Sequence, residues 1–539
     1  MRLPRLALIG LAAGHVLCAG GAMAQIRVVE WNVTNYGSPY TRDANFKTAL
    51  YGVAPNGLQL APDILIIQEV LQGAPGGAAN AAQFLSMLNT APGSPGDWAT
   101  APYIISLDTG NAMYYRTSKI QWLGTATLNT DTGTGPMQAP RDTQRWQVRL
   151  VGYSGIGAQL YMYGAHFKAG SAPADQERRN PEGRRIRIDS NALPNTANFL
   201  LCADLNIQNS SQVFYQWMIS EDSTPPAGEE FVADPSGRFF DPINTPAAGG
   251  SSVTWENNST YRYIHTQDPA GQMDSRHDQI IFGANLRDGQ GMDYMPFSVG
   301  GNVFSPFSLG TWNDPNHSYR CWGNDGSSYN GPLNTSSNAM VGNTIALALV
   351  SSAASGGHLP VYIDLQVPAK VNAPVSVAFG SVNINSVAQV MIQVSNGANV
   401  ALWSKSGTGL GIDSLNYSMS ASAGFTAPAG SFVDAAGGAA NSHTITMNTS
   451  TPGAKSGTLT ITSDDPDAPT LVINLSGVVG SLFDYDVDND GLVNIQDLYR
   501  WYGLFTDVDA NGTVDATDLA VLRGELRRTE IDDMKFGRR

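Results

Sequence analysis

The stretch that most constrains the fold is the aliphatic run Ile64-Leu65-Ile66-Ile67, which is followed directly by Gln68, Glu69 and Val70. Four consecutive aliphatic residues, three of them β-branched, predict a strand buried on both faces, as in a parallel or mixed sheet covered by helices. A carboxylate beside such a run is costly unless it is paired, binds a cation or reaches solvent. Glu69 is therefore either the exit of the strand into water or a ligand, and this strand alone does not decide between the two.

The chain has 539 residues, more than one hydrophobic core normally supports, so we expect several domains. Residues 1–24 are typical of an export signal, because Arg2 and Arg5 precede a short apolar stretch and Ala22-Met23-Ala24 forms a small-x-small cleavage site. No later apolar run reaches the length of a membrane span. We expect an exported protein in the periplasm, outside the cell or at the cell surface, without stable membrane insertion.

The formal net charge of −15 does not exclude a polyanionic substrate, because the acidic residues are unevenly placed. Nine aspartates lie between Asp484 and Asp518, which indicates bound cations rather than a general repulsive field. The densest basic cluster is either a solvated helix face or a phosphate contact; it consists of Arg178, Arg179, Arg184, Arg185 and Arg187. Beyond the signal only Cys202 and Cys321 remain, which argues against a disulfide framework and a cysteine nucleophile.

Residues 25–366 alternate apolar strands with Gly/Pro/Asn loops and a few helical stretches, which predicts an α/β domain with helices over sheets. The helical stretches are Ala78–Leu88, Arg184–Leu193 and Val213–Ser220. A Pro-containing connector at 367–374 marks the next boundary. Residues 367–479 are poor in charge and alternate with period two, which predicts a β-sandwich of about immunoglobulin size.

Residues 480–528 contain an internal repeat of two aspartate-rich loops, each with a glycine at the sixth position, and 529–539 form a tail. Each loop has oxygen ligands at positions one, three, five and twelve and leads into an apolar-periodic helix, Ile495–Leu504 or Ala516–Leu526. Hard oxygen ligands in a flexible loop suit Ca²⁺, so we predict two calcium sites. Their ligands are Asp486, Asp488, Asp490 and Asp497 in the first loop, and Asp507, Asp509, Asn511 and Asp518 in the second.

Polar residues follow several predicted strands of the first domain, and together they provide two histidines, three carboxylates and two carboxamides. If these strands lie in facing sheets, the groups converge on one site. Carboxylate and carboxamide oxygens suit a Mg²⁺-type ion, and two flanking histidines can donate to a phosphate oxygen and activate water. The residues are Asn32, Glu69, His166, Asp204, Asn206, Asp278 and His358.

Six short motifs in this order resemble those of the endonuclease/exonuclease/phosphatase superfamily, which has the fold of deoxyribonuclease I. They are Trp31-Asn32-Val33, Gln68-Glu69-Val70, His166-Phe167-Lys168-Ala169-Gly170, Asp204-Leu205-Asn206, Asp278-Gln279-Ile280-Ile281 and His358-Leu359-Pro360-Val361. The resemblance implies a four-layered α/β sandwich and hydrolysis of phosphodiester bonds with Mg²⁺ or Mn²⁺. It implies that Glu69 binds the metal with Asn32 beside it, and that His166 hydrogen-bonds the scissile phosphate.

By the same resemblance, Asp204 and Asn206 position the phosphate or the nucleophile. His358 is then the general base or acid, held in its tautomer by Asp278. Arg116 and Lys168 fall where substrate contacts are expected.

Two positions depart from the family pattern. The family usually has Ser-Asp-His before its last apolar strand, whereas this chain has Gly356-Gly357-His358, so a supporting carboxylate is missing. His277 stands where the family tends to have an aromatic residue.

The remaining modules carry resemblances of their own. Ser456–Gly477 resembles the abnormal-spindle-type immunoglobulin modules of exported bacterial proteins. The paired loops at 482–528 resemble a type I dockerin, which implies docking to a cohesin-type partner; a calcium module that only closes the C-terminus is the alternative.

The leading interpretation is an exported, metal-dependent nuclease. A phospholipid phosphodiesterase similar to sphingomyelinases is an alternative of the same fold, although no aromatic-aliphatic hairpin for membrane insertion is evident in the sequence. A non-catalytic scaffold or adhesion protein is the alternative of a different class, and Gly357 favours it.

Overall fold

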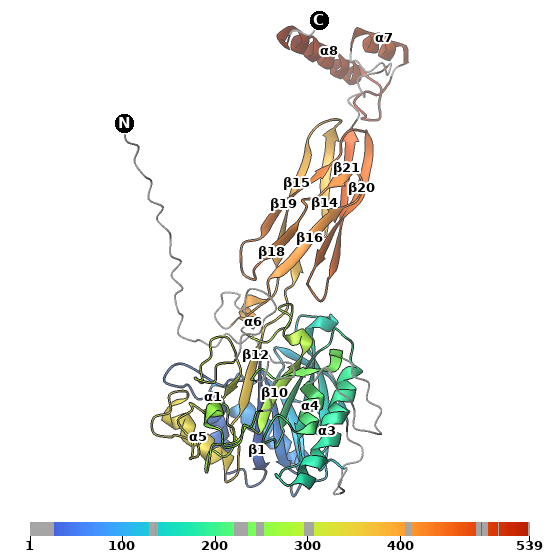
Figure 1. Ribbon diagram of the computed structural model, residues 1–539. Coiled ribbons are helices and arrows are strands. Elements are labelled where there is room, and N and C mark those ends of the chain that lie inside the picture. The colour runs from blue at the N-terminus through green and yellow to red at the C-terminus, as the bar shows by residue number, and fades with distance from the viewer. Residues whose placement is uncertain are drawn as a thin grey trace, which may run out of the picture.

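The computed structural model describes residues 26–128, 135, 138–219, 235–243, 253–295, 307–404, 411–480, 487, 494–504 and 506–536. The predicted export signal, and Asp486, Asp488 and Asp490 of the first calcium loop, lie outside the described residues. The chain forms an α/β region, a region of strands and a C-terminal helical region in sequence order (Figure 1). Among the described residues, no helix combines the length and the apolar character that crossing a membrane requires.

The α/β region contains two mixed six-stranded sheets. The first sheet has the order β11 (Arg320–Cys321), β12 (Val361–Leu365), β1 (Ile26–Tyr36), β2 (Ile64–Leu71), β4 (Thr109–Arg116) and β3 (Trp98–Thr100). The second has the order β5 (Ile120–Thr127), β6 (Gln144–Leu150), β7 (Gln159–His166), β8 (Asn198–Asp204), β10 (Asp278–Gly283) and β9 (Phe239–Phe240). Only β1–β2 and β7–β8 run parallel among these neighbours.

The two sheets face each other, and helices cover their outer faces (Figure 1). The helices α1 (Asp43–Tyr51), α2 (Gly77–Thr90) and α5 (Gly342–Ala353) pack on the first sheet. The helices α3 (Pro173–Asn191) and α4 (Val213–Ile219) pack on the second. The mixed-sheet α/β fold is therefore as predicted. The sequence prediction missed α1 and α5 and placed the start of α3 too late, because Pro181 inside that helix hid its first turns.

Strand β2 has the burial that its composition predicts, since Ile64, Leu65, Ile66 and Ile67 are all fully buried. Successive side chains alternate between the two faces of the strand. Leu65 and Ile67 join the core under the first helical layer, whereas Ile64 and Ile66 join the core between the sheets. Burial on both faces fixes the register of β2, and with it the position of Glu69 at its end.

A buried ion pair ties β1 to its neighbours. The Arg27 guanidinium donates to both carboxylate oxygens of Asp364 on β12, at 2.7 and 2.8 Å. It also donates to the carbonyl oxygens of Gln59 and Leu60, which precede β2. The bidentate pair and the two carbonyl partners give this buried cation four hydrogen bonds.

The next region consists mainly of strands, and its two sheets enclose a separate core. One sheet has the order β13 (Val371–Asn372), β15 (Ala388–Asn396), β19 (Asn441–Met447) and β17 (Phe425–Thr426). The other has the order β14 (Ser376–Asn383), β21 (Thr470–Gly480), β20 (Gly453–Ser463), β16 (Leu415–Ala421) and β18 (Ser431–Asp434). We call this region the strand sandwich.

The strand sandwich contacts the α/β region through polar and apolar groups. Asp467, in the turn between β20 and β21, accepts hydrogen bonds from the backbone N–H groups of Ser154 and Gly155, both at 2.7 Å. Its other oxygen pairs with Lys370 at 2.8 Å. Trp403, in the short helix α6 (Val400–Trp403), is buried in the core of the α/β region. Beyond the sandwich follow α7 (Ile495–Leu504), as predicted, and α8 (Ala516–Phe536), which extends past its predicted end at Leu526.

Replacing Arg27 by Met should lower the free energy of unfolding by about 3 to 5 kcal/mol, because Asp364 is then buried without a partner. The double variant Arg27→Met/Asp364→Leu should recover much of that loss, since it removes the orphaned charge as well. Denaturant unfolding of both variants measures this. A single variant as stable as the wild-type protein would contradict the assigned role of the pair.

Candidate active site

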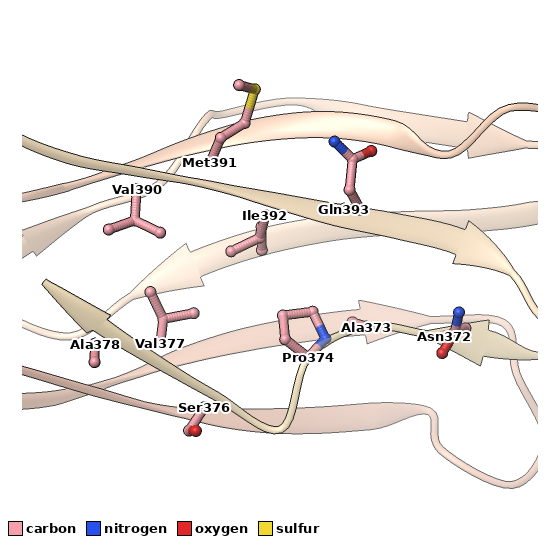
Figure 2. Close-up of a pocket in the computed structure, with 10 residues that line it drawn as sticks. All are labelled: Asn372, Ala373, Pro374, Ser376, Val377, Ala378, Val390, Met391, Ile392 and Gln393. Carbon is pink, nitrogen blue, oxygen red and sulfur yellow. The ribbon is translucent and has the colours of Figure 1, made fainter.

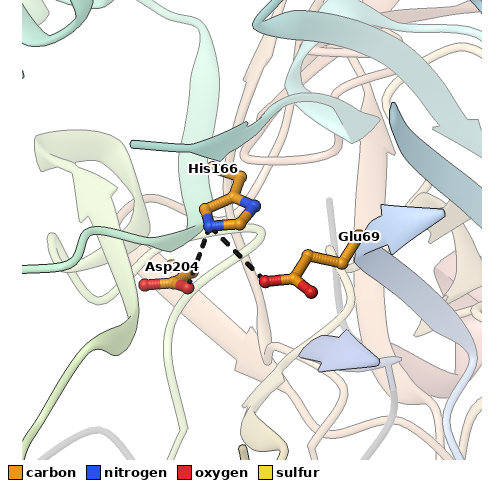
Figure 3. Close-up of side chains that lie close together, drawn as sticks. All are labelled: Glu69, His166 and Asp204. Carbon is orange, nitrogen blue, oxygen red and sulfur yellow. Dashed lines mark ion pairs between the residues drawn. The ribbon is translucent and has the colours of Figure 1, made fainter. Parts of the chain in front are cut away.

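The predicted polar residues meet where the ends of β1, β2, β7, β8 and β10 come together. Within the second sheet, His166 and Asp278 lie opposite Asp204 on either side. Within the first sheet, Asn32 lies beside Gln68, the residue before Glu69. Because the sheets face each other, Glu69 of the first approaches His166 and Asp204 of the second (Figure 3).

One amide group joins the two sheets at this site. Asn32 Nδ2 donates to Glu69 Oε1 at 3.0 Å and to Asp204 Oδ2 at 2.8 Å. Asn32 Oδ1 accepts the backbone N–H of Thr34 at 2.9 Å, which fixes the amide orientation. The structure places Asn32 beside Glu69, as expected, with its oxygen turned to the backbone and its nitrogen holding the two carboxylates in place; that Asn32 is a metal ligand stays a prediction.

The backbone around the site is conformationally unusual. Glu69 has a φ of 62°, and Thr34, Asn35 and Asn206 have values of 50°, 52° and 47°. Residues other than glycine adopt this left-handed region at a cost, and they persist there when the surroundings require it. At Glu69 the turn breaks the alternation of β2, and Glu69 Oε2 accepts the Asn35 N–H at 2.8 Å. The bend thus directs the carboxylate to the site, although Glu69 follows four core residues.

Two histidines flank Asp204. His166 Nε2 lies 3.3 Å from Asp204 Oδ2 and 3.8 Å from Glu69 Oε1 (Figure 3). His358 Nε2 lies 3.8 Å from the same Asp204 oxygen, and its Nδ1 donates to Asp278 Oδ2 at 2.7 Å. Asn206, whose N–H donates to Asp204 Oδ1 at 2.9 Å and whose side chain donates to the Phe167 carbonyl, completes the support.

The two histidines have opposite protonation preferences. Burial, and to a smaller extent the Arg141 charge, lower the pKa of His166 to about 4. Burial also opposes the charge on His358, but Asp278 and Asp204 outweigh it and raise its pKa to about 10. Burial alone would raise the pKa of Asp204, yet the neighbouring histidines hold it below its usual range. At neutral pH His166 is therefore neutral and His358 is an imidazolium.

The donor set fits a divalent cation. Glu69, His166 and Asp204 each offer a ligand atom, and these atoms all lie within 4.8 Å of one another. The pKa values of about 4 and about 10 leave His166 neutral and His358 charged, so one imidazolium faces the carboxylates of Glu69, Asp204 and Asp278. Burial raises the pKa of Asp278. Carboxylate oxygens of Glu69 and Asp204 that converge on one point suit Mg²⁺ or Mn²⁺.

The structure explains why Gly357 stands in place of the usual Asp. A Cβ atom at Gly357 would collide with the carbonyl oxygen of Ala353, the last residue of α5. The path of the chain from α5 to β12 therefore has no room for any side chain at this position. His358 is oriented instead by Asp278, whose own N–H donates to the Thr266 hydroxyl, and by the Trp31 indole, which donates to the His358 carbonyl.

The predicted substrate contacts are placed elsewhere. Arg116 forms an ion pair with Asp97 at the end of β4 that lies beside Ile64, whereas Glu69 lies at the opposite end of β2. The prediction that Arg116 contacts substrate is therefore wrong, because antiparallel pairing carries it to the far edge of the sheet. Lys168 lies two residues beyond His166 and pairs with Asp175 at 2.8 Å.

Two arginines of the predicted basic cluster, Arg179 and Arg187, are fully buried. They therefore belong neither to a solvated helix face nor to a phosphate contact. Arg179 donates to the carbonyl oxygens of Lys168 and Gly170, and Arg187 donates to those of Trp217 and Met218. These arginines attach α3 to the loops around it. Their role is structural, because they lie on the face of α3 that packs against the α/β core.

Three residues near the site were not given a role from the sequence. Glu30 is fully buried on the same face of β1 as Asn32, and its burial beside Asp278 and Asp204 raises its pKa well above its usual range. Arg141 donates to the Phe167 carbonyl and pairs with Asp108. The ring of His277 lies 6.4 Å from that of His358. Glu30 could have been predicted from the sequence, because it is a charged residue in a predicted strand, two residues before Asn32. No sequence pattern pointed to Arg141.

The second calcium loop has converging carboxylates. Asp507, Asp509 and Asp518 each offer an oxygen, and these atoms lie within 4.8 Å of one another. Asp518 accepts the backbone N–H groups of Val508 and Asp515, and Asp507 accepts that of Gly512. Asn511 Oδ1 accepts the Thr513 N–H. Of the predicted ligands of the first loop the structure describes Asp497, which lies in the first turn of α7.

Comparison with known proteins finds no family model that matches and no curated protein of similar sequence. Solved structures that are similar include the human Nocturnin catalytic domain with bound sulfate, at 12% identity and a TM-score of 0.34, covering 63% of this chain and 94% of that chain. D. rerio TDP2 complexed with a single-strand DNA product has 13% identity and a TM-score of 0.35, covering 64% and 99%. A Bacteroides thetaiotaomicron mannosyl-6-phosphatase has 12% identity and a TM-score of 0.35, covering 63% and 99%. These TM-scores are too low to support a conclusion about function, which we argue from the site.

In metal-free protein, His166 should titrate near pH 4 and His358 near pH 10, and NMR of ¹⁵N-labelled histidine measures both. Because the folded pKa of His358 lies above its ordinary value of 6.5, its stabilising contribution is complete below about pH 6.5 and is lost as pH rises toward 10. The stability difference between the wild-type protein and His358→Gln should shrink over that range. Two histidines that both titrate near 6.5 would contradict the assigned electrostatics.

Proposed function

We propose that this protein is a divalent-metal-dependent phosphodiesterase and that its substrate is a nucleic acid. The observation that carries the proposal is the junction of Glu69, Asp204 and His166 with the His358–Asp278 pair at the facing ends of two sheets. A cation-binding carboxylate pair beside one neutral and one charged imidazole is suited to hydrolysis of a phosphate ester. The resemblance of six sequence motifs to the endonuclease/exonuclease/phosphatase superfamily supports the same class.

The side chains divide the work of hydrolysis between them. The imidazolium of His358, held by Asp278, donates to the phosphoryl oxygens or the leaving oxygen and stabilises their negative charge. Asp204, kept ionised by the histidines that lower its pKa, accepts a hydrogen bond from the attacking water and orients it. The new bond joins the water oxygen to phosphorus, and the bond to the leaving alcohol breaks. That alcohol takes the proton of the His358 imidazolium, and the proton that the water gives up at Asp204 passes to His358, whose Nε2 lies 3.8 Å from Asp204 Oδ2.

Glu69 and Asp204 would hold the metal, with His166 beside them. A bound Mg²⁺ or Mn²⁺ supplies charge neutralisation at the phosphoryl oxygens. Asn32 keeps both carboxylates directed to one point, because its amide nitrogen contacts each of them. Neutral His166 adds a hydrogen-bonding group without adding a charge that would repel the cation.

One observation favours a second candidate, a phospholipid phosphodiesterase. Ile105 and Leu107 are 74% and 67% exposed, and they precede β4 at the end that pairs with Val70 and Leu71, next to Glu69. Exposed aliphatic side chains beside a catalytic site are suited to contact with a lipid surface. The sequence had offered no such feature, because Tyr103 is the single aromatic residue near Ile105 and Leu107 and no aromatic-aliphatic hairpin is evident there.

Hydrolysis of plasmid DNA, RNA and sphingomyelin vesicles with Mg²⁺ or Mn²⁺ tests the assignment. We expect nucleic-acid cleavage that chelator, Glu69→Ala and His358→Ala each reduce by at least about 10²-fold. Ile105→Ser/Leu107→Ser should leave nucleic-acid cleavage unchanged and would lower only lipid hydrolysis. Cleavage that persists in His358→Ala would refute the role of His358. If the pure protein hydrolyses none of the substrates, it is the scaffold or adhesion protein that the sequence left open.

We further propose that the protein is exported and attaches to a partner through its C-terminal module. The sequence of residues 1–24 supports export, and the loop carboxylates of Asp507, Asp509 and Asp518 support a calcium-dependent module. The likeness of the paired loops to a type I dockerin makes a cohesin-type protein the proposed partner. The strand sandwich, with its likeness to abnormal-spindle-type modules, then separates the catalytic region from that attachment.

Calorimetry with Ca²⁺ should detect two sites on the full chain. Asp507→Ala should abolish one of them and Asp486→Ala/Asp507→Ala both, because each removes the first ligand of its loop. Glu525→Ala is the control, since it also removes one acidic side chain but lies in α8, outside both twelve-residue loops. A titration that is the same for all four proteins would refute the calcium loops.

A further inference from the structure

The strand sandwich has an open edge between β14 and β15. The short strand β13 pairs with β15 only at Ser395 and Asn396. It then leaves that sheet at Pro374, which has no N–H group to donate, and continues as β14 beside β21 in the other sheet. Among the described residues, β15 therefore has β19 on one side and, from Ala388 to Val394, no strand on the other.

A groove of about 540 Å³ runs along this open edge (Figure 2). Val390 and Ile392 of β15 point across it toward Val377 and Pro374, whereas Met391 and Gln393 point to the opposite side of the strand. None of its ten lining residues carries a charge. Strand edges of soluble proteins are usually protected by lysine, by inward charges or by a covering segment, and this edge has none of these in the described structure.

The edge also has the most exposed aliphatic side chains of the described chain. Val375 is 84% exposed and Val387 is 82% exposed, and Met391, at the middle of the free part of β15, is 66% exposed. Apolar side chains this exposed at a strand edge with free backbone groups are typical of a surface that pairs with another strand.

We propose that β15 pairs with β15 of a second copy of this chain and thereby forms an antiparallel dimer. The strand is self-complementary about Met391: in a two-fold arrangement Val390 lies opposite Ile392, and Gln389 lies opposite Gln393. No like charges meet in this register, although the whole chain has a formal net charge of −15. Both grooves are then closed from the side, and one sheet continues through two molecules.

This arrangement keeps the catalytic regions apart. The end of β15 at Asn396 lies next to the α/β region, because Lys370 bonds to Asn396 and to Gly152. In an antiparallel pair the two α/β regions therefore extend from opposite ends of the shared sheet. The dimer does not depend on the reaction proposed above, so either inference can fail without the other.

Sedimentation velocity of the full chain tests the dimer between about 1 and 100 µM. We expect the wild-type protein to dimerise with rising concentration, and Met391→Lys and Met391→Glu each to weaken dimerisation at least about ten-fold. The reason is that directly opposite residues of an antiparallel pair lie about 5 Å apart, where like charges repel. An equimolar mixture of the two variants should recover the dimer, which a folding defect would not allow.

Thr444→Lys is the matched control, because Thr444 is an exposed neighbour of Met391 on β19, one strand in from the edge. This variant should dimerise like the wild-type protein. A wild-type chain that stays monomeric throughout would overturn the proposal and assign the edge to a strand of another protein. Self-association of Met391→Lys equal to that of the wild-type chain would also overturn it.

Discussion

The Asn32 amide is the contact on which the site depends, because it is bonded to both sheets at once. Its nitrogen donates to Glu69 of the first sheet and to Asp204 of the second, while its oxygen is held by the backbone of Thr34. Two carboxylates this close repel each other, so the structure that holds them together favours the binding of a positive charge between them. A divalent cation would supply that charge, and the registers of β1 with β2 and of β7 with β8 place the groups that would bind it.

Burial gives the two histidines different chemistry although both lie near Asp204. His166 has carboxylates at 3.3 and 3.8 Å, and burial keeps it neutral, with a pKa of about 4. His358 has a short hydrogen bond to Asp278, and the combined carboxylates raise its pKa to about 10. In enzymes, two titratable groups whose surroundings move their pKa values apart are typically the acid and the base of the reaction. The collision at Gly357 shows that this chain orients His358 from β10 and not from the residue before it.

The sequence predicted the parts of the fold that follow from periodicity. The aliphatic run at Ile64–Ile67 predicted a strand buried on both faces, and α2 and α4 lie where apolar periodicity placed them. The orientation of side chains could not be predicted, because it depends on pairing between distant strands. Arg116 lies at the far edge of its sheet, away from Glu69, and Asn32 has its amide nitrogen, not its oxygen, directed to the carboxylates. Arg179 and Arg187 were misread, because a charged side chain inside a core bonds to carbonyl groups that no local pattern reveals.

The central claim is that Glu69 and Asp204 bind a divalent metal beside the two histidines, and paramagnetic Mn²⁺ tests it most directly. In the full chain saturated with Ca²⁺, added Mn²⁺ should broaden the ¹⁵N-histidine signals of His166 and His358 and leave that of His443, in the strand sandwich, unchanged. Glu69→Ala should remove the broadening while both histidines keep their signals. Equal broadening in the wild-type protein and in Glu69→Ala, or none in the wild-type protein, would contradict the account.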